Sequence, residues 1–365
     1  MAMAEWDELG VTADPGRVHT EGRMVRAILE DARDQVATLF GVRPRQVIFT
    51  SGGSEAVNAA IAGARPERDG PMALADVEHS SVRLASARAG EVVTIPVDSF
   101  GRITPEAVEA TLERCEAEFG TTPAVLHCQW ANHEVGTIQP VEAVVDLCAQ
   151  RAVPVQVDAT AAAGQIPLQL GTVGALGVEA VSVSAHRFGG PVGIGALIVG
   201  PGVRLDPFIL GGEQERGRRA GLENIRAAVG FAAVATALSD AGRIADESAT
   251  ARTRTDALVA AALSVPGVVA FGDRDDCLPN LVCLGIDGVE AEPVLLGLDQ
   301  AGIAAHSGSS CSSETLEPSP VLEAMGVDGE RSLRLSVGWS STDDDVAAFA
   351  GAFPGVVAGL RSLRA

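Results

Sequence analysis

Apolar positions follow two different spacings along the chain. Between residues 23 and 40 they recur at helical spacing, as at Met24, Ile28 and Leu29, and this pattern predicts an amphipathic helix. Short β-branched runs then alternate with alanine-rich stretches, and they predict strands at 46–50, 71–75, 91–96, 124–129, 154–157, 180–184 and 195–199. This alternation is typical of a doubly wound, mostly parallel sheet, so the sequence predicts an α/β fold.

A second, smaller α/β part is predicted after a long helical stretch from Asn224 to about Ser264. Three later runs, at 279–285, 293–301 and 332–337, predict a second sheet with covering helices. We place the boundary at residue 245, which gives a large domain, 1–245, and a small C-terminal domain, 246–365.

Composition and charge exclude several classes of protein. The 365 residues are 47% hydrophobic and 21% charged, which is enough apolar material for a large core and excludes disorder. The net charge of -21 repels phosphate backbones, so we expect no general nucleic-acid binding. We find neither an apolar run of eighteen residues nor a signal-peptide pattern, and we expect a cytoplasmic protein without membrane association.

The cysteines, histidines and cations carry further information. Six cysteines form neither a CxxC pair nor a metal-ligand spacing, so we expect no metal site and small, buried thiols everywhere except Cys311. His127 lies in an apolar strand and is expected to be a satisfied core side chain. The chain contains no lysine, because all 27 residues counted as Lys plus Arg are arginines. Any mechanism that needs a lysine of this chain is therefore excluded.

Two motifs follow predicted strands in the first half of the chain. In Phe49-Thr50-Ser51-Gly52-Gly53-Ser54-Glu55, the amide of Gly53 and the hydroxyl of Ser54 lie at a helix start, where a phosphate can bind. The same pattern also suits a tight turn with an N-cap. Asp158 follows a buried strand, where ligands of open α/β sheets bind, although an aspartate there can simply cap the next helix.

Two further motifs contain Ser184, His186, Arg187 and Cys311. The first three follow a strand and precede a glycine loop, a composition that suits an anion and is also typical of a plain turn. Cys311 lies in the polar, small-residue run His306-Ser307-Gly308-Ser309-Ser310-Cys311-Ser312-Ser313, which is too polar for a core. We interpret it as a reactive thiol.

Together and in this order, the four motifs resemble one family, the cysteine desulfurases. This family belongs to the class V aminotransferase group of pyridoxal-phosphate enzymes, which have the aminotransferase fold of type I. The similarity runs from residues 18–22 to 333–338 and includes the segments 78–79, 132–136 and 211–217. It therefore covers most of the chain.

The resemblance implies a cofactor cleft and a role for each motif. His79 would stack on the pyridine ring, Asp158 would pair with the ring nitrogen, and His133 would lie beside the ring oxygen. Arg334 would bind the substrate carboxylate, and Cys311 would attack the sulfur of bound L-cysteine to become a persulfide, with alanine as by-product. The phosphate would be held by Gly53, Ser54, Ser184 and His186.

The chain departs from the family pattern where the cofactor is held. Arg187 occupies the position of the lysine that binds the cofactor covalently, and its guanidinium has a pKa above about 12. Arg187 offers no free amine and is a poor proton shuttle. Because it occupies the lysine position, we still count it as a catalytic candidate, together with Cys311 and His79. Three other contacts differ from the family: His133 replaces an asparagine, Ala161 a glutamine and Leu222 a threonine. Pyridoxal phosphate would then be bound without a covalent bond, or not at all.

Three hypotheses follow for the function. The first is a weak or unusual desulfurase that mobilises sulfur from L-cysteine, with His133 or His306 as replacement base and a sulfur-acceptor protein as partner. The second is a catalytically degenerate partner or scaffold subunit of the same fold. The third is a different reaction, in which Arg187, His186 and Ser184 bind another small anionic ligand. The family also implies a two-fold dimer, in which the loop from Gly211 to Leu222 completes the neighbour's phosphate site.

Overall fold

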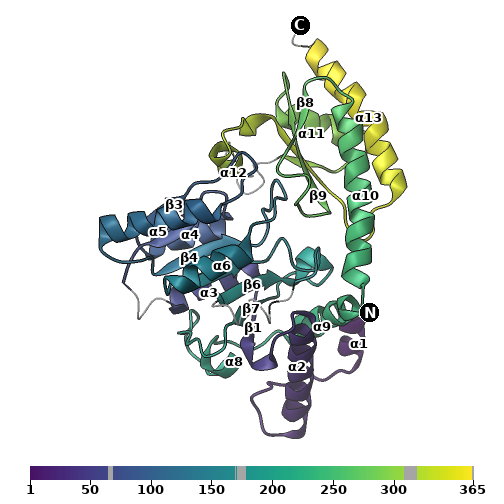
Figure 1. Cartoon of the computed structure of the whole chain (residues 1–365). Coiled ribbons are helices and arrows are strands. Elements are labelled where there is room, and N and C mark those ends of the chain that lie inside the picture. The colour runs from purple at the N-terminus through teal and green to yellow at the C-terminus, as the bar shows by residue number, and fades with distance from the viewer. Residues whose placement is uncertain (65–68, 169, 171–177, 308–318, 364–365) are drawn as a thin grey trace.

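Two β-sheets organise the molecule (Figure 1). The computed structural model describes residues 1–64, 69–168, 170, 178–307 and 319–363. The larger sheet has seven strands in the order β1-β7-β6-β5-β4-β2-β3. Strand β7 is antiparallel to both of its neighbours, and all other pairs are parallel. The strands are β1 (Val47–Thr50), β2 (Met72–Ala75), β3 (Val92–Ile95), β4 (Val125–Gln129), β5 (Val155–Asp158), β6 (Val178–Ser184) and β7 (Gly195–Val199).

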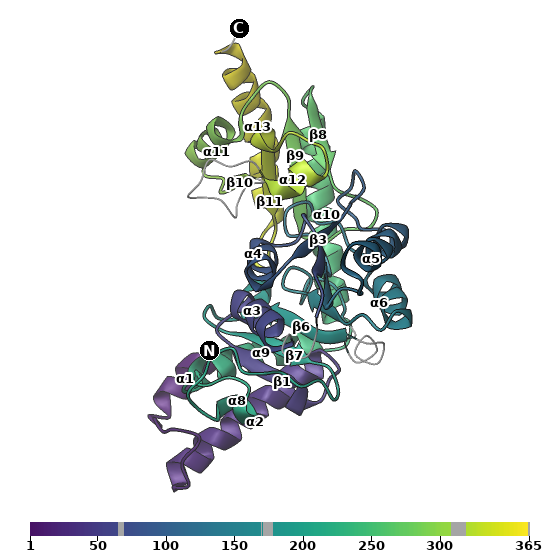
Figure 2. The ribbon, with the colours of Figure 1, turned by 90° about the vertical axis from the view of Figure 1, so that its left-hand side faces the viewer.

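Helices cover both faces of this sheet, which is why its strands read as continuous apolar runs. Figure 2 shows α3 (Gly53–Ala64) and α4 (Ser80–Ala89) on one face and α5 (Pro105–Phe119) and α6 (Val141–Gln150) on the other. Alternate residues of β2 pack on opposite sides: Met72 and Leu74 contact the α3 and α4 side, whereas Ala73 and Ala75 belong to the main core. The predicted α/β fold with a mostly parallel sheet is confirmed.

A group of helices packs beside the strand pair β1 and β7. It contains α1 (Ala2–Glu8), α2 (Thr20–Leu39) and α9 (Ile225–Ser239), and the 3₁₀ turn η1 (Pro44–Gln46) connects α2 to β1. The helix predicted at 23–40 is thus α2, which begins three residues earlier because the His19 ring accepts a hydrogen bond from the backbone N–H of Gly22. Its buried face includes Val25 and Leu29, whereas Met24 is 47% exposed.

The helical stretch predicted from 224 to 264 is two helices, α9 and α10 (Arg243–Leu263), bent by 84°. The break spans residues 240–242, and Gly242, the N-cap of α10, has a φ of +86°, a left-handed conformation that favours glycine. By length and composition, no single helix among the described residues could cross a membrane, and α9 and α10 meet that test only when taken together.

The smaller sheet is antiparallel and has its own core. Its order is β10-β11-β9-β8, and α10, α11 (Ala291–Gln300) and α13 (Asp343–Ser362) pack against it. The strands are β8 (Val268–Phe271), β9 (Leu281–Ile286), β10 (His306–Ser307) and β11 (Ser332–Ser336), and two short turns, α12 (Pro320–Ala324) and η4 (Gly329–Arg331), precede β11. The domain boundary at residue 245 stays a prediction.

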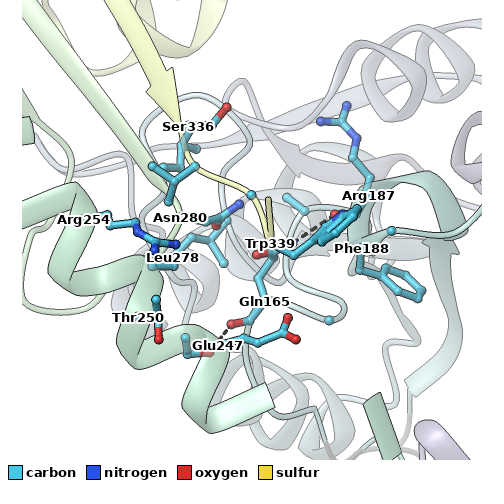
Figure 3. Close-up of a pocket in the computed structure, with 18 of the residues that line it drawn as sticks. Gln165, Arg187, Phe188, Glu247, Thr250, Arg254, Leu278, Asn280, Ser336 and Trp339 are labelled. Atoms are coloured by element: carbon cyan, nitrogen blue, oxygen red, sulfur yellow. Dashed lines mark hydrogen bonds between the residues drawn. The ribbon is translucent and has the colours of Figure 1, made fainter. Parts of the chain in front are cut away.

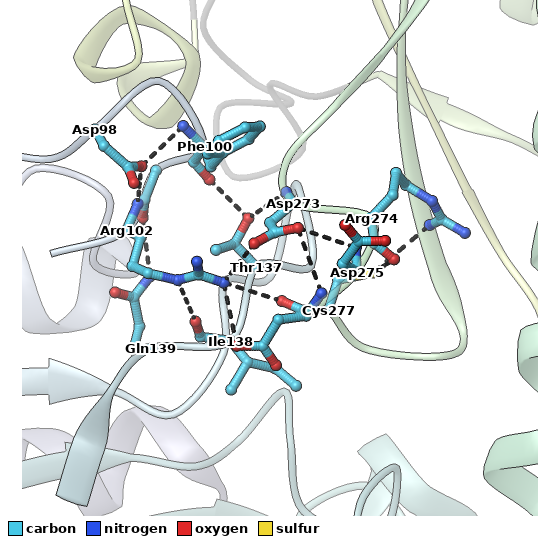
Figure 4. A network of polar contacts seen from close by, with 12 residues as sticks. Asp98, Phe100, Arg102, Thr137, Ile138, Gln139, Asp273, Arg274, Asp275 and Cys277 are labelled. Carbon is cyan, nitrogen blue, oxygen red and sulfur yellow. Dashed lines mark hydrogen bonds and ion pairs between the residues drawn. The ribbon is translucent and has the colours of Figure 1, made fainter. Parts of the chain in front are cut away.

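Arg102 joins the loops of the two sheets (Figure 4). It follows β3, and its Nη2 lies 2.8 Å from Asp273 Oδ2 and 3.2 Å from Asp276 Oδ2, both in the loop between β8 and β9. Thr137 Oγ1 donates to the Phe100 carbonyl at 2.6 Å and accepts from the Asp273 backbone N–H at 3.1 Å. Charge-assisted and backbone hydrogen bonds therefore hold the small sheet against the large one.

Candidate active site

The predicted cofactor residues come together at one edge of the large sheet. Because the carboxyl ends of its parallel strands meet there, the segments that follow β1, β2, β4, β5 and β6 converge. They line a cavity of about 250 Å³. The residues predicted from the sequence that line it are Gly53, Ser54, His79, His133, Asp158, Ser184, His186 and Arg187.

A second cavity, of about 720 Å³, adjoins the first (Figure 3). The two share His133, Ala161, His186 and Arg187 in their walls, so they form one cleft. The larger cavity extends to Arg334, Ser336 and Trp339 of the small sheet region and to the α10 side chains Glu247, Thr250 and Arg254. Cys311 lies outside the described residues.

The N-terminus of α3 and the residues facing it form an anion cradle. A Cβ at Gly53 would lie 2.8 Å from Thr160 Oγ1, so only glycine fits this close approach. Ser184 Oγ and His186 Nδ1 lie 2.9 Å apart, and among the described residues the buried Thr160 hydroxyl has no hydrogen-bond partner. Backbone N–H groups at a helix start and unpaired hydroxyls favour a bound anion. Thr160 was not identified from the sequence.

Asp158 is held in a fixed orientation at the end of β5. Its Oδ1 accepts two hydrogen bonds, from Ser182 Oγ and from the Thr160 backbone N–H, both at 2.9 Å. Ser182 lies on the neighbouring strand β6 and is paired with Asp158 in register. A serine at this point of β6 is thus a supporting residue that the sequence motif did not reveal.

His79 is oriented by the helix that it begins. It is the N-cap of α4, and its Nδ1 accepts from the Ser81 backbone N–H at 3.1 Å. The neutral ring therefore carries its proton on Nε2. The His79 and His133 rings meet edge to face, with centroids 5.0 Å apart.

Buried amides fix the loops that carry the two histidines. Asn132 accepts from the backbone N–H groups of Glu134 and Val135 at 2.8 and 2.9 Å, and its Nδ2 donates to the Val77 carbonyl at 3.0 Å. Gln129 Nε2 donates to the same carbonyl at 2.9 Å. These bonds tie the loop after β4 to the loop after β2, so the spacing of the histidines does not depend on a ligand.

Arg334 reaches the cleft from the small sheet. It lies on β11, opposite His306 of β10, and its Nη1 donates to the His133 carbonyl at 3.3 Å. A guanidinium so placed can bind a carboxylate in the larger cavity. His306 is exposed and lines neither of the two cavities.

Arg187 lies in the 3₁₀ turn η2 (Ala185–Phe188), directly after β6. Its carbonyl accepts from Gln165 Nε2 at 3.0 Å, while its exposed side chain lines both cavities. Partial burial lowers the pKa of His186, and the neighbouring charge of Arg187 lowers it further. Arg187 thus brings a permanently charged guanidinium to the wall of the cleft.

A buried ion pair anchors the loop between Gly211 and Leu222. Arg33 of α2 makes two hydrogen bonds to Glu215, at 2.6 and 2.9 Å, and both side chains are almost fully buried. Glu215 lies in the short helix α8 (Gln214–Gly217) at a φ of 50°, a conformation uncommon for a residue other than glycine. Arg219 binds Glu55 in the first turn of α3 at 2.9 Å. No sequence pattern indicated the pairing of Arg33 with Glu215.

The remaining cysteines are structural thiols, as predicted. Cys115, Cys128, Cys148, Cys277 and Cys283 are all buried and free. Burial raises the pKa of both Cys148 and Cys283 to about 12, which keeps these thiols protonated and unreactive.

Comparisons with known proteins agree with this fold and cleft. The aminotransferase class-V family model matches residues 9–349. Cysteine desulfurase IscS 1 of Archaeoglobus fulgidus is 36% identical over 360 residues, which cover 96% of this chain and 91% of that protein. The IscS-like cysteine desulfurase of Mycobacterium tuberculosis is 36% identical over 361 residues, which cover 94% and 89%.

Solved structures show the same fold. A NifS-like protein superposes with a TM-score of 0.86 at 27% identity, over 98% of this chain and 96% of its own. A NifS-like protein from Rickettsia africae superposes with a TM-score of 0.86 at 26% identity, over 97% of this chain and 95% of its own. The architecture is that of the NifS-like, fold-type I pyridoxal-phosphate enzymes. The chain belongs to the class V aminotransferase family, and its relatives within that family are cysteine desulfurases.

Proposed function

We propose that this protein is a cysteine-desulfurase-like enzyme that mobilises sulfur from L-cysteine through a persulfide on Cys311. One observation carries the proposal: the residues that the family uses to hold its cofactor line one cavity, although they come from five separate strand ends. Activity is weak or unusual, because Arg187 lies where the family has its cofactor-binding lysine.

The cavity offers partners for the phosphate, the ring nitrogen and the ring face of pyridoxal phosphate, but no residue for covalent attachment. The α3 N-terminus and the unpartnered Thr160 hydroxyl suit the phosphate, the oriented Asp158 carboxylate suits the ring nitrogen, and the His79 ring suits the ring face. No lysine exists anywhere in the chain to bind the aldehyde. The cofactor would therefore be held by non-covalent contacts, and when bound it would withdraw electrons from the substrate carbon.

The chain's own residues then position the substrate and move protons. Arg334 binds the carboxylate of cysteine in the larger cavity. The Cys311 thiolate attacks the substrate sulfur: an S–S bond forms, the C–S bond breaks, its electron pair stays on carbon, and that carbon takes a proton to give alanine. His133 is the better candidate for the base, because it lines both cavities whereas His306 lines neither. The carboxylate of Glu134, 3.6 Å from His133 Nε2, is a partner for the protonated ring.

Alanine release from cysteine tests this proposal. With added pyridoxal phosphate, the protein is expected to form alanine above the protein-free background, and C311S and H133Q are expected to lose that activity. H306Q is the matched control and should retain it. No alanine above background, or equal rates in C311S and the unaltered protein, would overturn the proposal.

The second candidate, a catalytically degenerate partner or scaffold subunit, is favoured by the charged Arg187 side chain in the cleft. In that case the purified protein releases no alanine alone and binds an active relative or a sulfur-acceptor protein. A stable homodimer that turns over cysteine unaided would exclude it. The two-fold dimer and the cytoplasmic location expected from the sequence are parts of our proposal.

A further inference from the structure

A separate small cavity of about 10 Å³ lies among β4, β5 and β6 and the helices α3 and α4. This volume is about that of one water probe. Its polar lining residues come from separate elements, which the fold brings together. They are Glu78, His127, Gln156, Asp158 and Ser182.

Two of these residues carry buried polar atoms without a partner. Glu78 and His127 are each only 3% exposed, and among the described residues Glu78 Oε2 and His127 Nε2 make no hydrogen bond. The other carboxyl oxygen of Glu78 accepts from the Gln129 backbone N–H at 2.7 Å. Buried polar groups in folded proteins are almost always paired, often by an ordered water with two to four partners. Both unpaired atoms belong to residues that line this one cavity.

Burial favours the uncharged form of both residues. Burial raises the pKa of Glu78, and the nearby Asp158 adds to this effect, whereas the Gln129 N–H and His133 lower it; the net result is a pKa of about 8. Burial lowers the pKa of His127 to about 4. The other titratable group beside Glu78 is Cys128 of β4, whose pKa burial and Glu78 both raise, so it stays a thiol. A protonated carboxyl and a neutral imidazole are complementary partners for one water: the first donates to it and the second accepts from it.

We propose that this cavity is a built water site, in which one ordered water bridges the carboxyl of Glu78 and the imidazole of His127 behind Asp158. The water and the Gln129 N–H together satisfy both oxygens of an uncharged Glu78. An uncharged Glu78 then adds no second carboxylate charge beside Asp158, which lines the same small cavity. This inference concerns the apoprotein and does not depend on the proposed function.

A high-resolution crystal structure of the protein tests the site directly. We expect a density peak within hydrogen-bond distance of both Glu78 Oε2 and His127 Nε2. A dry cavity, or direct contact between the two side chains, would overturn the proposal.

The charge state of Glu78 has an independent readout in solution. Infrared difference spectra at pH 7 should show the C=O band of a buried, protonated carboxyl that is absent in Glu78→Gln and displaced in His127→Leu, which removes one partner of the water. The control Glu91→Gln alters an exposed residue and should leave the band unchanged. A band that survives in E78Q, or no band at pH 7, would refute the inference.

The pH dependence of stability separates this arrangement from simple packing. The folded protein holds the Glu78 proton up to about pH 8, whereas the unfolded chain releases it near 4.5, so this group's contribution to stability falls as pH rises through that window. The Tm of E78Q relative to the unaltered protein should therefore increase from pH 6 to pH 9. A Tm difference that stays constant from pH 6 to pH 9 would indicate that the Glu78 carboxyl contributes only by packing, and would contradict the inference.

Discussion

Replacing Arg187 by lysine restores the amine that the cleft lacks. Arg187 lies directly after His186 on a turn whose backbone position is fixed by the bond from Gln165. Within the described part of the chain its guanidinium makes no ion pair or hydrogen bond, and the side chain is exposed. A lysine can therefore take its place without leaving a buried group unpaired.

The two expected effects of this change differ greatly in size. Stability should change by less than about 0.5 kcal/mol, as is usual for exposed side chains without such contacts. The rate of alanine formation should rise roughly 10²- to 10⁴-fold, which is the usual contribution of a positioned acid–base group. This gain in rate would not come from a change of charge, because arginine and lysine are both cations.

Intact mass and alanine release measure the outcome for R187K. After incubation with pyridoxal phosphate and borohydride reduction, this variant should gain the mass of one phosphopyridoxyl group. The control R45K places a lysine at an exposed site far from the cleft and should show neither mass gain nor rate increase. If R187K binds no cofactor covalently and its rate stays at the level of R45K, the cleft does not present residue 187 to the cofactor.

Three further predictions concern stability. Glu215→Ala removes the two-bond partner of the buried Arg33, which keeps a longer contact to Glu30 at 3.4 Å, and should lower the free energy of unfolding in urea by up to about 3–5 kcal/mol, whereas E213A, at an exposed neighbour, should have little effect. Arg102→Gln removes the charged link between the sheets and should cost about 1–3 kcal/mol in the same assay; an unchanged midpoint would contradict its role. The pKa of His127 in the folded protein is about 4 instead of 6.5, so its contribution to stability is complete above pH 6.5 and is lost as pH falls toward 4, by roughly 3 kcal/mol. The variant H127Q should lack this acid-side loss, and an identical acid limb in both proteins would refute the assignment.

The sequence was sufficient for the parts of the molecule that depend on local pattern. All seven strands of the large sheet lie where apolar runs predicted them, and the motifs after them converge because parallel strands end at one edge. The break between α9 and α10 was missed, because Gly242 lies in an otherwise continuous helical pattern and its left-handed conformation was not anticipated.

Pairings between distant residues could not be predicted. Arg33 and Glu215 are 182 positions apart, and each alone reads as an ordinary surface charge. His127 was predicted to be a satisfied core side chain: burial is confirmed, and because no described residue pairs with its Nε2, a satisfied ring depends on the water that we propose. Its relation to Glu78 arises only when β4 packs beside the loop after β2, and strand periodicity contains no information about that contact.

The central claim is that the cleft binds pyridoxal phosphate with no covalent bond. Equilibrium dialysis of the unaltered protein against the cofactor, followed by borohydride reduction and intact mass, tests it most directly. We expect saturable binding with an altered absorption band, complete loss of the cofactor on further dialysis, and an unchanged protein mass after reduction. A mass increase of one phosphopyridoxyl group, or no binding at all, would contradict it.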